Sequence, residues 1–454
     1  MGTDMTKGSI TKHIFRFAFP VALGILFQQL YNIVDTMIVG RLLGVNSLAG
    51  VGSTTGLWFF EFSVVCGICN GFAVSTAQSF GEGNKAEVKG FFRNGLVLGM
   101  MISLVLMMLT IMSTAWILKL TNTPNDIYNY AHDYIIVLFE GIPFTFIYNY
   151  FSASLRSIGD SRTPVIALVI ASFLNMGLDV FFIMNLGMGV AGAALATVIS
   201  QIVSGVFLGL YIIRKVEMFH FAITLRIDHS KSRIQLKTAI PMALQGAAIS
   251  IGILIVQASV NSLGTIYVVG STAGNKLYGI MAAPVDAICQ SLIPLSSQNY
   301  GARRIDRIKE GWKKVVLYAW IFTAVLSVIA WFAGPYMIRI FIDTADKEII
   351  SYGHQFLICF VLGFGFLGIQ QGTCFTLQGT GNSEFTIASG ILETAGRLFG
   401  ALVLTKMIGY MGICLALPLA WVFTDMYMVP VYFLCIRRMS DTKETAVSKL
   451  QPQM

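Results

Sequence analysis

The sequence predicts an all-α polytopic membrane protein whose twelve transmembrane helices form two similar halves. The chain has 454 residues, of which 55% are hydrophobic and 12% are charged, and its mean hydropathy is +0.72. Because a soluble domain carries about 25% charged residues, this composition excludes an ordinary soluble protein. The apolar residues form long continuous runs, whereas a membrane β-barrel would show weak alternating segments.

Twelve segments are apolar enough to cross a bilayer, which takes about 20 residues per helix. We expect them near 13–39, 50–77, 92–119, 132–155, 162–185, 190–213, 236–262, 267–297, 314–341, 350–378, 384–407 and 411–436. The longest polar connection divides the chain into two groups of six helices. The expected parts are an N-terminal lobe at 1–214, a linker at 215–235, a C-terminal lobe at 236–440 and a polar tail at 441–454.

The two halves resemble each other in sequence, which predicts an internal repeat. The segment RFAFPVALGILFQQL matches KTAIPMALQGAAISI. The matched positions are Pro20 with Pro241, Gln78 with Gln298, Gly81 with Gly301 and Gly159 with Gly381. Six helices is an even number, so both halves begin on the same side of the membrane. Such parallel repeats are related by an axis along the membrane normal, with substrate bound between the lobes.

Basic residues indicate how the chain is oriented in the membrane. Most of the 31 lysines and arginines lie in the N-terminal segment, in loops near 78–93, 156–162, 214–237 and 301–314, and in the C-terminal segment. Cytoplasmic loops carry such an excess, so we expect both termini to be cytoplasmic and the protein to lie in a prokaryotic cell membrane. The net charge of +8 belongs to this pattern, and no nucleic-acid partner is expected.

Two carboxylates lie inside apolar segments, Asp35 in LFQQLYNIVDTMIVG and Asp179 in SFLNMGLDVFFIM. A carboxylate at the centre of a membrane helix costs about 2.5–3.5 kcal/mol, and such groups usually face a cavity or an ion pathway. Asn175 precedes Asp179 by one helical turn and lies on the same face. These residues predict a transporter with an ion-coupling site; the alternative is a polar cluster that only stabilises helix packing.

The second half lacks these carboxylates. The positions that match Asp35, Asn175 and Asp179 are Ile255 or Val256, Arg397 and Ala401. We therefore expect the coupling site to lie in the first half alone. Glu393 and Arg397 are four residues apart, which favours an ion pair within one helix, with a substrate contact as the alternative.

Other polar positions have two interpretations each. Pro20 lies inside the first helix, where it removes a backbone hydrogen bond; it is either a hinge or a static kink. Asp286 either contacts a cationic substrate in a central cavity or pairs with a neighbour. Glu61, Glu140 and Asp425 also lie within or near spans.

No sequence motif indicates a cofactor or an enzyme. The G-x-G-x-x-G match at 187–192 follows a membrane helix instead of a strand, and no phosphate-binding G-x-x-x-x-G-K-[ST] segment is present. The five histidines lack metal-ligand spacing. The seven cysteines lie mostly in apolar runs and are expected to be free, buried thiols.

The chain resembles the multidrug and toxic compound extrusion (MATE) family. The resemblance is carried by Pro20, Gln28 and Asp35 in the first helix and by the run SFLNMGLDVFFIMNLGMGVAGAALATVISQ. It implies a V-shaped pair of six-helix lobes and cation-coupled export. In members with an N-lobe site, the coupling cluster matches Asp35, Asn175, Asp179 and Thr197 here, and their oxygens suit Na⁺ as well as a proton.

The resemblance also brings in a second branch of the family, in which the coupling carboxylates lie in the C-terminal lobe. At those positions this chain has Ile249 or Ser250 and the pair Gln370–Gln371. The resemblance therefore favours the N-lobe-coupled, DinF-like branch.

The resulting prediction is an antiporter that exports amphipathic, often cationic organic compounds, coupled to inward Na⁺ or H⁺ flux. Gln28 and Asp286 would line the substrate cavity, and a monomer in the lipid bilayer is expected. One alternative is a lipid-linked oligosaccharide flippase of the same superfamily, for which Lys276 and Arg397 are the cationic residues to consider. A membrane-embedded enzyme would need a nucleophile–base pair or a metal set, and no such pattern is visible.

Overall fold

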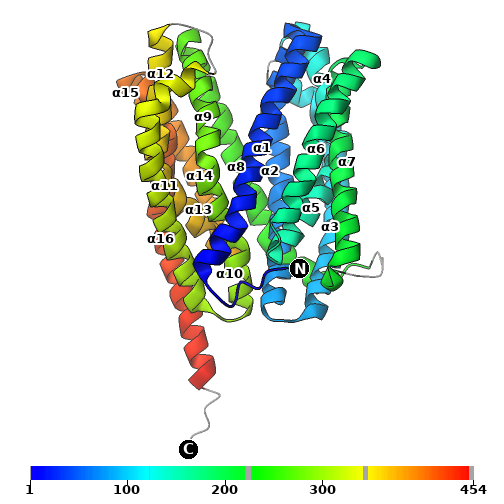
Figure 1. Cartoon of the computed structure of the whole chain (residues 1–454), viewed down its shortest axis with the longest axis vertical. Helices are drawn as coiled ribbons and strands as arrows, with labels where there is room; N and C mark the ends of the chain where they lie inside the picture. The colour runs from blue at the N-terminus through cyan, green and yellow to red at the C-terminus, as the bar shows by residue number, and fades with distance from the viewer. Residues whose placement is uncertain (1, 122, 220–225, 341–345, 449–454) are drawn as a thin grey trace, which may run out of the picture. The chain divides into compact units, whose positions relative to one another are not determined.

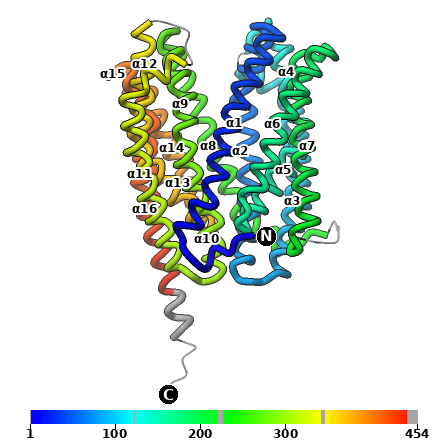
Figure 2. Tube along the Cα trace, viewed as in Figure 1, coloured from blue at the N-terminus to red at the C-terminus, as the bar shows by residue number. Residues whose placement is uncertain are grey.

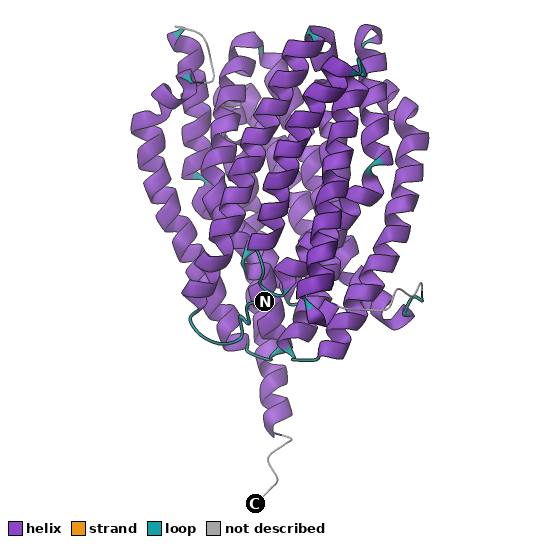
Figure 3. Ribbon diagram, turned by 45° about the vertical axis from the view of Figure 1, so that its right-hand side comes forward, coloured by secondary structure: helices purple, strands orange, loops and turns teal. Residues whose placement is uncertain are grey.

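The chain is helical almost throughout the part that the structure describes. The computed structural model describes residues 2–121, 123–219, 226–340 and 346–448, and gives only the backbone for 442–448. These ranges contain no β-strand, as Figure 3 shows. Parts of the linker expected at 215–235 and of the tail expected at 441–454 lie outside the described residues.

The helices follow one another through short turns, as labelled in Figure 1 and traced in Figure 2. The first half contains α1 (Ile10–Leu43), α2 (Val45–Gly81), α3 (Lys85–Leu120), α4 (Asn125–Glu140), α5 (Ile142–Ser157), α6 (Arg162–Val180), the π-helical turn η1 (Phe181–Asn185), α7 (Gly189–Lys215) and the 3₁₀ turn η2 (Glu217–Phe219). The second half contains α8 (His229–Leu263), α9 (Thr265–Gln290), α10 (Leu292–Gly301), α11 (Ile305–Arg339), α12 (Lys347–Leu362), α13 (Phe364–Gly379), the 3₁₀ turn η3 (Ser383–Phe385), α14 (Thr386–Leu398), the π-helical turn η4 (Phe399–Leu404), α15 (Thr405–Ile408) and α16 (Tyr410–Ser448).

The predicted membrane fold is confirmed. Among the described residues, ten helical segments are long and apolar enough to span a membrane, and two bent helix pairs bring the number to twelve. Several helices are longer than expected; α1 has 34 residues and α2 has 37. At 1.5 Å per residue these helices are about 50 Å long, so their ends extend beyond a hydrocarbon core of about 30 Å.

Two of the expected continuous spans, 132–155 and 350–378, are bent pairs in the structure. The axes of α4 and α5 differ by 50°, and those of α12 and α13 differ by 45°. Each break falls at a glycine with no room for a side chain: a Cβ on Gly141 would lie 2.5 Å from Val198 Cγ2, and one on Gly363 would lie 2.8 Å from Trp421 Cζ3. Pro143, at the start of α5, also lacks the N–H needed to continue α4.

The internal repeat extends to individual contacts. The helices α4, α5, α12 and α13 all have 16 residues. In the first half the Cys69 thiol donates to the carbonyl oxygen of Phe146 across 3.7 Å. In the second half Cys289 donates to the carbonyl oxygen of Gly368 across 3.8 Å. Equivalent side chains therefore make equivalent bonds in the two halves.

The structure divides into two compact units whose borders cut through two helices. Unit 1 contains Met1–Thr3, Leu23–Thr76 and Asn84–Ala243, and unit 2 contains Asp4–Ala22, Ala77–Gly83 and Leu244–Met454. Helix α1 thus passes from unit 2 to unit 1 after Ala22, and α8 passes from unit 1 to unit 2 after Ala243. In both helices the border comes two residues after the matched proline, Pro20 or Pro241. The lobe boundaries expected from sequence stay a prediction.

The N-terminal segment of unit 2 is anchored by a buried arginine on α11. The Arg307 guanidinium donates to the carbonyl oxygens of Met5 (3.0 Å), Lys7 (3.4 Å) and Gly8 (2.9 Å). Its Nε donates to Asn299 Oδ1 across 3.1 Å. The Met5 side chain is buried, so these residues form a fixed strap ahead of α1.

Candidate ion-coupling site

The four residues predicted for ion coupling come from three helices of unit 1. Asp35 lies on α1, Asn175 and Asp179 lie one turn apart on α6, and Thr197 lies on α7. Asn175 and Asp179 are fully buried, at 1% and 0% exposure, whereas Asp35 and Thr197 are half-buried. The π-helical turn η1 begins two residues after Asp179, and such turns are frequent at functional sites.

The Asn175 amide joins α6 to both α1 and α7. One of its terminal atoms lies 2.9 Å from Asp179 Oδ2 and 3.0 Å from the Tyr31 hydroxyl, and the other lies 3.3 Å from Thr197 Oγ1 and 3.0 Å from the Thr197 nitrogen. Since an ionised carboxylate only accepts hydrogen bonds, the amide nitrogen faces Asp179 and Tyr31 and donates to them. The amide oxygen then accepts from Thr197, an orientation assigned from the hydrogen-bond network.

The two carboxyl groups of the site contact each other. Asp35 and Asp179 lie within hydrogen-bonding reach. In each of them Oδ1 is buried and has no hydrogen-bond partner among the described residues. Two ionised carboxylates offer acceptors only and repel each other strongly in a medium of low dielectric constant. The arrangement therefore requires a proton or a cation to be stable.

Two tyrosines that sequence reasoning did not assign to the site complete it. The Tyr31 hydroxyl lies near the Asn175 amide and within hydrogen-bonding reach of Thr197. Tyr134, on α4, is close enough to Asp35 and Asp179 to interact with both electrostatically. The spacing of Tyr31, one turn before Asp35, was a usable signal, whereas nothing in the sequence connects Tyr134 to the site.

An apolar layer lies one helical turn from the polar cluster. Val39, Ile183 and Ala193 form a buried core cluster against which Tyr134 packs. Val39 comes four residues after Asp35, Ile183 comes four residues after Asp179, and Ala193 comes four residues before Thr197. Because that layer excludes water, charges in the site interact more strongly than they would near the surface.

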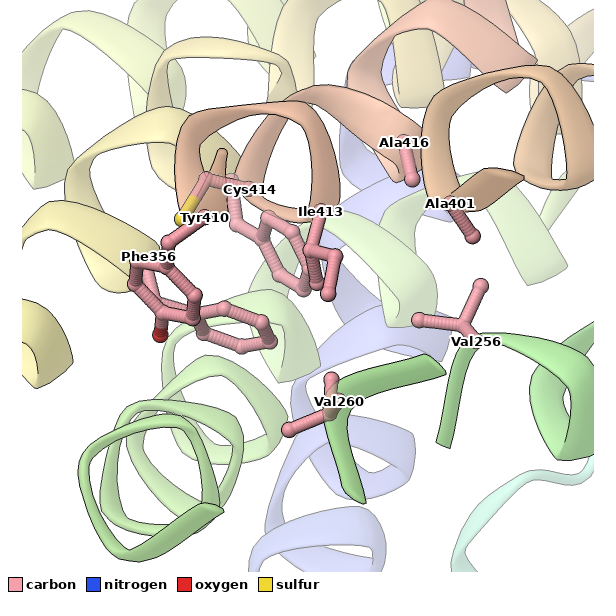
Figure 4. Packing of buried hydrophobic residues seen from close by; sticks show 9 residues of the cluster. Val256, Val260, Phe356, Ala401, Tyr410, Ile413, Cys414 and Ala416 are labelled. Atoms are coloured by element: carbon pink, nitrogen blue, oxygen red, sulfur yellow. The ribbon is translucent and has the colours of Figure 1, made fainter. Parts of the chain in front are cut away.

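At the corresponding place, unit 2 has an apolar cluster. Val256, one of the two candidate counterparts of Asp35, and Ala401, the counterpart of Asp179, belong to one buried cluster together with residues of α12 and α16. Figure 4 shows the two side chains directed toward each other. The positions of the two carboxylates are therefore apolar in unit 2, whereas Arg397, the counterpart of Asn175, is charged and paired with Glu393.

A buried polar network in unit 2 lies on α9, α13 and α14. The predicted ion pair is confirmed: Arg397 Nη2 lies 2.5 Å from Glu393 Oε1. Arg397 Nη1 also donates to the carbonyl oxygen of Ile249 across 3.0 Å. Gln370 donates to Glu393 Oε2 across 3.1 Å, and Gln371 donates to Asp286 Oδ1 across 2.9 Å. The role expected for Asp286 at the substrate cavity stays a prediction.

The remaining predicted residues lie on α1. Pro20 is buried and does not interrupt the helix. Gln28 is half-buried in unit 1, seven residues before Asp35. Seven residues correspond to two helical turns, so both side chains lie on the same face of α1.

Oxygen atoms of this site can serve as ligands for a hard cation. In the described part of the chain, no three or more His, Cys, Asp or Glu side chains gather to hold a metal ion. A Na⁺ ion here would instead use the two carboxylates with neutral oxygens of Asn175, Thr197 or Tyr31, the ligand type that hard cations prefer. The buried Oδ1 atoms of Asp35 and Asp179, which lack partners among the described residues, fit this donor set.

Comparison with known proteins agrees with the fold and the internal repeat. The model of the MatE family matches residues 20–181 and 241–396, once in each half. The chain is 27% identical over 401 residues to the probable multidrug resistance protein YpnP of Bacillus subtilis, covering 88% of this chain and 86% of that protein. It is 23% identical to the FAD transporter of Shewanella oneidensis over 98% of this chain and 99% of that one.

Solved structures show the same fold at low sequence identity. A crystal structure of MATE in complex with MaL6 superposes with a TM-score of 0.89 at 20% identity, covering 97% of this chain and 99% of that one. An outward-facing multidrug resistance MATE transporter of the MOP superfamily superposes with a TM-score of 0.87, also at 20% identity, over 96% and 98% of the two chains.

The family model that matches once in each half, together with the ten to twelve candidate spans among the described residues, makes this chain a multi-pass membrane transporter and not an enzyme. The family model covers most of the chain, so the chain belongs to the multidrug and toxic compound extrusion family, whose members include multidrug efflux transporters.

Proposed function

We propose that this chain is a secondary antiporter that exports amphipathic, often cationic organic compounds, driven by inward Na⁺ or H⁺ flux. The observation that carries the proposal is the contact between the Asp35 and Asp179 carboxyl groups within membrane-spanning helices. A buried acid pair that needs a proton or cation changes its charge when the ion leaves, which a coupling site requires. Relatives described as multidrug resistance and multidrug export proteins support the substrate class.

The proposed coupling residues are Asp35, Asn175, Asp179 and Thr197, with Tyr31 as an additional oxygen. Assignment to the N-lobe-coupled, DinF-like branch rests on the contrast between the units. The polar cluster of unit 1 has Val256 and Ala401 as its counterparts in unit 2. An apolar pair cannot hold an ion, so a single coupling site per chain follows from this difference.

Ion binding is proposed to control the distance between α1 and α6. When the ion leaves, two ionised carboxylates on different helices repel each other. Pro20 would then act as the hinge of α1, because proline lacks the N–H that stiffens the preceding turn. Two residues beyond Pro20, α1 passes from one unit to the other, which supports this role.

Gln28 and Asp286 are the proposed polar contacts for substrate. Gln28 lies on the Asp35 face of α1, where a substrate would compete with or respond to the bound ion. Asp286 is a membrane-embedded carboxylate that accepts a hydrogen bond from the Gln371 amide. A cationic substrate would neutralise its charge, which favours positively charged compounds.

The orientation and assembly proposed here follow from charge and topology. The basic loops and termini favour a cytoplasmic location of both ends of the chain in a prokaryotic cell membrane. Each chain contains both halves of the repeat, so a monomer is sufficient for alternating access.

A lipid-linked oligosaccharide flippase is the alternative within the same superfamily. Such a protein would need free cationic groups to hold a pyrophosphate. Arg397 is instead engaged by Glu393 and by the Ile249 carbonyl oxygen, and Lys276 is exposed near the middle of α9. These contacts favour an exporter of neutral or cationic compounds.

The direct test uses purified protein in lipid vesicles loaded with a fluorescent organic cation. A pH gradient and a Na⁺ gradient are imposed separately, and efflux is followed against protein-free vesicles. We expect at least one gradient to drive efflux and labelled lipid-linked oligosaccharide to stay in its leaflet. Lipid flipping without gradient-driven dye efflux would contradict the proposal and favour the flippase.

A further inference from the structure

Three sulfur atoms from two helices of unit 2 meet at the edge of the apolar cluster described above. The Cys359 thiol, on α12, lies 3.8 Å from the thioether sulfur of Met411, on α16. The thiols of Cys359 and Cys414 lie within hydrogen-bonding reach of each other. Cys414 and Met411 are both in the first turns of α16. These contacts lie outside the proposed ion-coupling and substrate positions.

The distance between the Cys359 and Met411 sulfurs matches that between two ligands of one metal ion. At metal–sulfur distances of about 2.3 Å, two ligands of a tetrahedral or trigonal ion lie about 3.8–4.0 Å apart. The Cys359–Met411 separation of 3.8 Å falls at this value.

The ligand type selects the class of ion. Thiolates and thioethers are soft ligands that favour Cu(I), whereas Zn²⁺ takes four ligands, normally without a thioether. The surroundings are mostly apolar: Val260, Phe356 and Ile413 belong to the same buried cluster, and the polar neighbour of the Met411 sulfur is the Gln355 amide, which donates to it across 3.8 Å. In such a medium an uncharged complex is favoured, and a monovalent ion with one thiolate, one thiol and one thioether has no net charge.

We propose that Cys359, Met411 and Cys414 bind one soft monovalent metal ion, Cu(I) or Ag(I). Binding transfers one thiol proton to solvent and changes no oxidation state. Cys414 is buried, while Cys359 and Met411 are partly exposed, so the ion has a route to the site. The bound ion joins α12 to α16 close to the bend at Gly363.

The site belongs to unit 2 alone. Helices α4 and α12 correspond residue by residue, which places Val137 at the position of Cys359. The segment GAALA at 192–196 matches GICLA at 412–416, which places Ala194 at the position of Cys414. The first half therefore serves as an internal comparison without sulfur at these positions.

The test titrates Cu(I) and Ag(I), with Zn²⁺ as a third probe, into the reduced, purified full chain in the absence of oxygen. Competition with a chromophoric Cu(I) chelator measures stoichiometry. We expect one equivalent of Cu(I) or Ag(I) to bind to the wild type, and this equivalent to be lost in Cys359→Ser and Cys414→Ser. Cys66→Ser, half-buried like Cys359, and Cys435→Ser, buried on the same helix as Cys414, are the matched controls and should keep it.

X-ray absorption identifies the ligands independently. The wild type should show three sulfurs around Cu(I), and Met411→Leu should show two. The proposal would be overturned if the wild type bound no Cu(I) or Ag(I), or if binding were unchanged in Cys359→Ser. Equal loss of binding in the two control variants, or preferential binding of Zn²⁺, would also overturn it.

A measurement on the wild type covers the case in which the variants fail to fold. Ag(I) should protect Cys359 from alkylation, read by mass spectrometry of the peptide, while Cys66 is alkylated to the same extent with and without the ion. Equal alkylation of Cys359 in both conditions would also overturn the proposal.

Discussion

Asp35 and Asp179 contain four carboxyl oxygens, which an ion bound at the proposed site would have to share with a proton. A Na⁺ ion between two carboxylates offsets the repulsion of both, whereas one proton neutralises only one of them. Protons and Na⁺ therefore compete for the site. Asn175 and Thr197 add neutral oxygens, which a Na⁺ ion uses and a proton does not require.

Replacement of Thr197 by valine tests this difference. Valine keeps the shape of the side chain but removes Oγ1, which lies 3.3 Å from the Asn175 amide. We expect Thr197→Val to weaken Na⁺ binding about tenfold, the size of one lost polar ligand, and to change H⁺ coupling less. In the wild type, Na⁺ affinity should fall as the pH is lowered, because protons then occupy the carboxylates.

The measurement is a Na⁺ titration of purified protein at several pH values, followed by calorimetry or tryptophan fluorescence. Ser172→Ala is the matched control, because it removes a buried hydroxyl on α6 that donates to the Leu168 carbonyl oxygen. A Na⁺ affinity that is independent of pH and unaffected by Thr197→Val would contradict the shared site.

Part of the site was predictable from sequence because of its helical spacing. Asn175 and Asp179 are one turn apart, so they had to share a face. The association of Asp35 with Asp179 came from the family resemblance, since no local pattern relates residues on α1 and α6. Tyr134 had no signal at all, because its place depends on how α4 packs in the folded unit.

Helix α1 is the element that connects the coupling site to the border between the units. It contains Pro20 two residues before the border and Asp35 four turns beyond Pro20. A helix with a missing backbone hydrogen bond bends at low cost. An element of this kind can transmit the charge state of the site to the strap that precedes it.

Pro20→Ala is expected to slow transport without changing ion affinity. Alanine restores the backbone hydrogen bond and stabilises the helix by up to about 3 kcal/mol, so α1 bends less readily. Efflux rate and Na⁺ affinity are measured on the same vesicle preparation. Pro430→Ala, which changes a proline inside α16 within unit 2, is the control; an equal loss in both variants would show that Pro20 is a static kink.

Arg307→Ala should release the N-terminal strap. The change removes donors to three backbone carbonyl oxygens and to Asn299, which should lower stability by about 2–3 kcal/mol. Amide hydrogen exchange of residues 4–8 should become faster while that of α7 is unchanged. Arg304→Ala, an exposed neighbour paired with Asp306, is the control, and unchanged exchange at residues 4–8 in Arg307→Ala would contradict the anchoring role.

The sequence predicted the number of spans but not the breaks within two of them. Hydropathy windows average over Gly141 and Gly363, although glycine and the nearby Pro143 were visible signals. The π-helical turn after Asp179 had no signal, because FFIMN contains neither glycine nor proline. Such turns follow from packing in the folded unit, which local sequence does not determine.

At the scale of the whole molecule, two similar halves differ in chemistry. The repeat extends to matched hydrogen bonds at Cys69 and Cys289, so the scaffold itself was predictable from the matched segments. The carboxylate pair of one unit corresponds to Val256 and Ala401 of the other. The proposed ion site therefore has no counterpart with two carboxylates in the other unit.

Gln370→Ala and Gln371→Ala should lower stability and leave ion coupling intact. These glutamines donate to Glu393 and Asp286, and each loss leaves a buried acceptor short of a partner, at about 1–3 kcal/mol. Thermal unfolding and Na⁺- or pH-dependent efflux are measured together. Loss of ion dependence with substrate binding kept would move the coupling site to the second unit.

The central claim is that the Asp35–Asp179 pair couples export to an ion gradient. Its most direct test measures gradient-driven efflux from vesicles containing Asp35→Asn or Asp179→Asn, beside equilibrium binding of the same substrate and the exposed-acid control Glu82→Gln. We expect both asparagine variants to bind substrate but to export it no faster than protein-free vesicles, while the control exports normally. Gradient-driven export at the wild-type rate in either asparagine variant would contradict it.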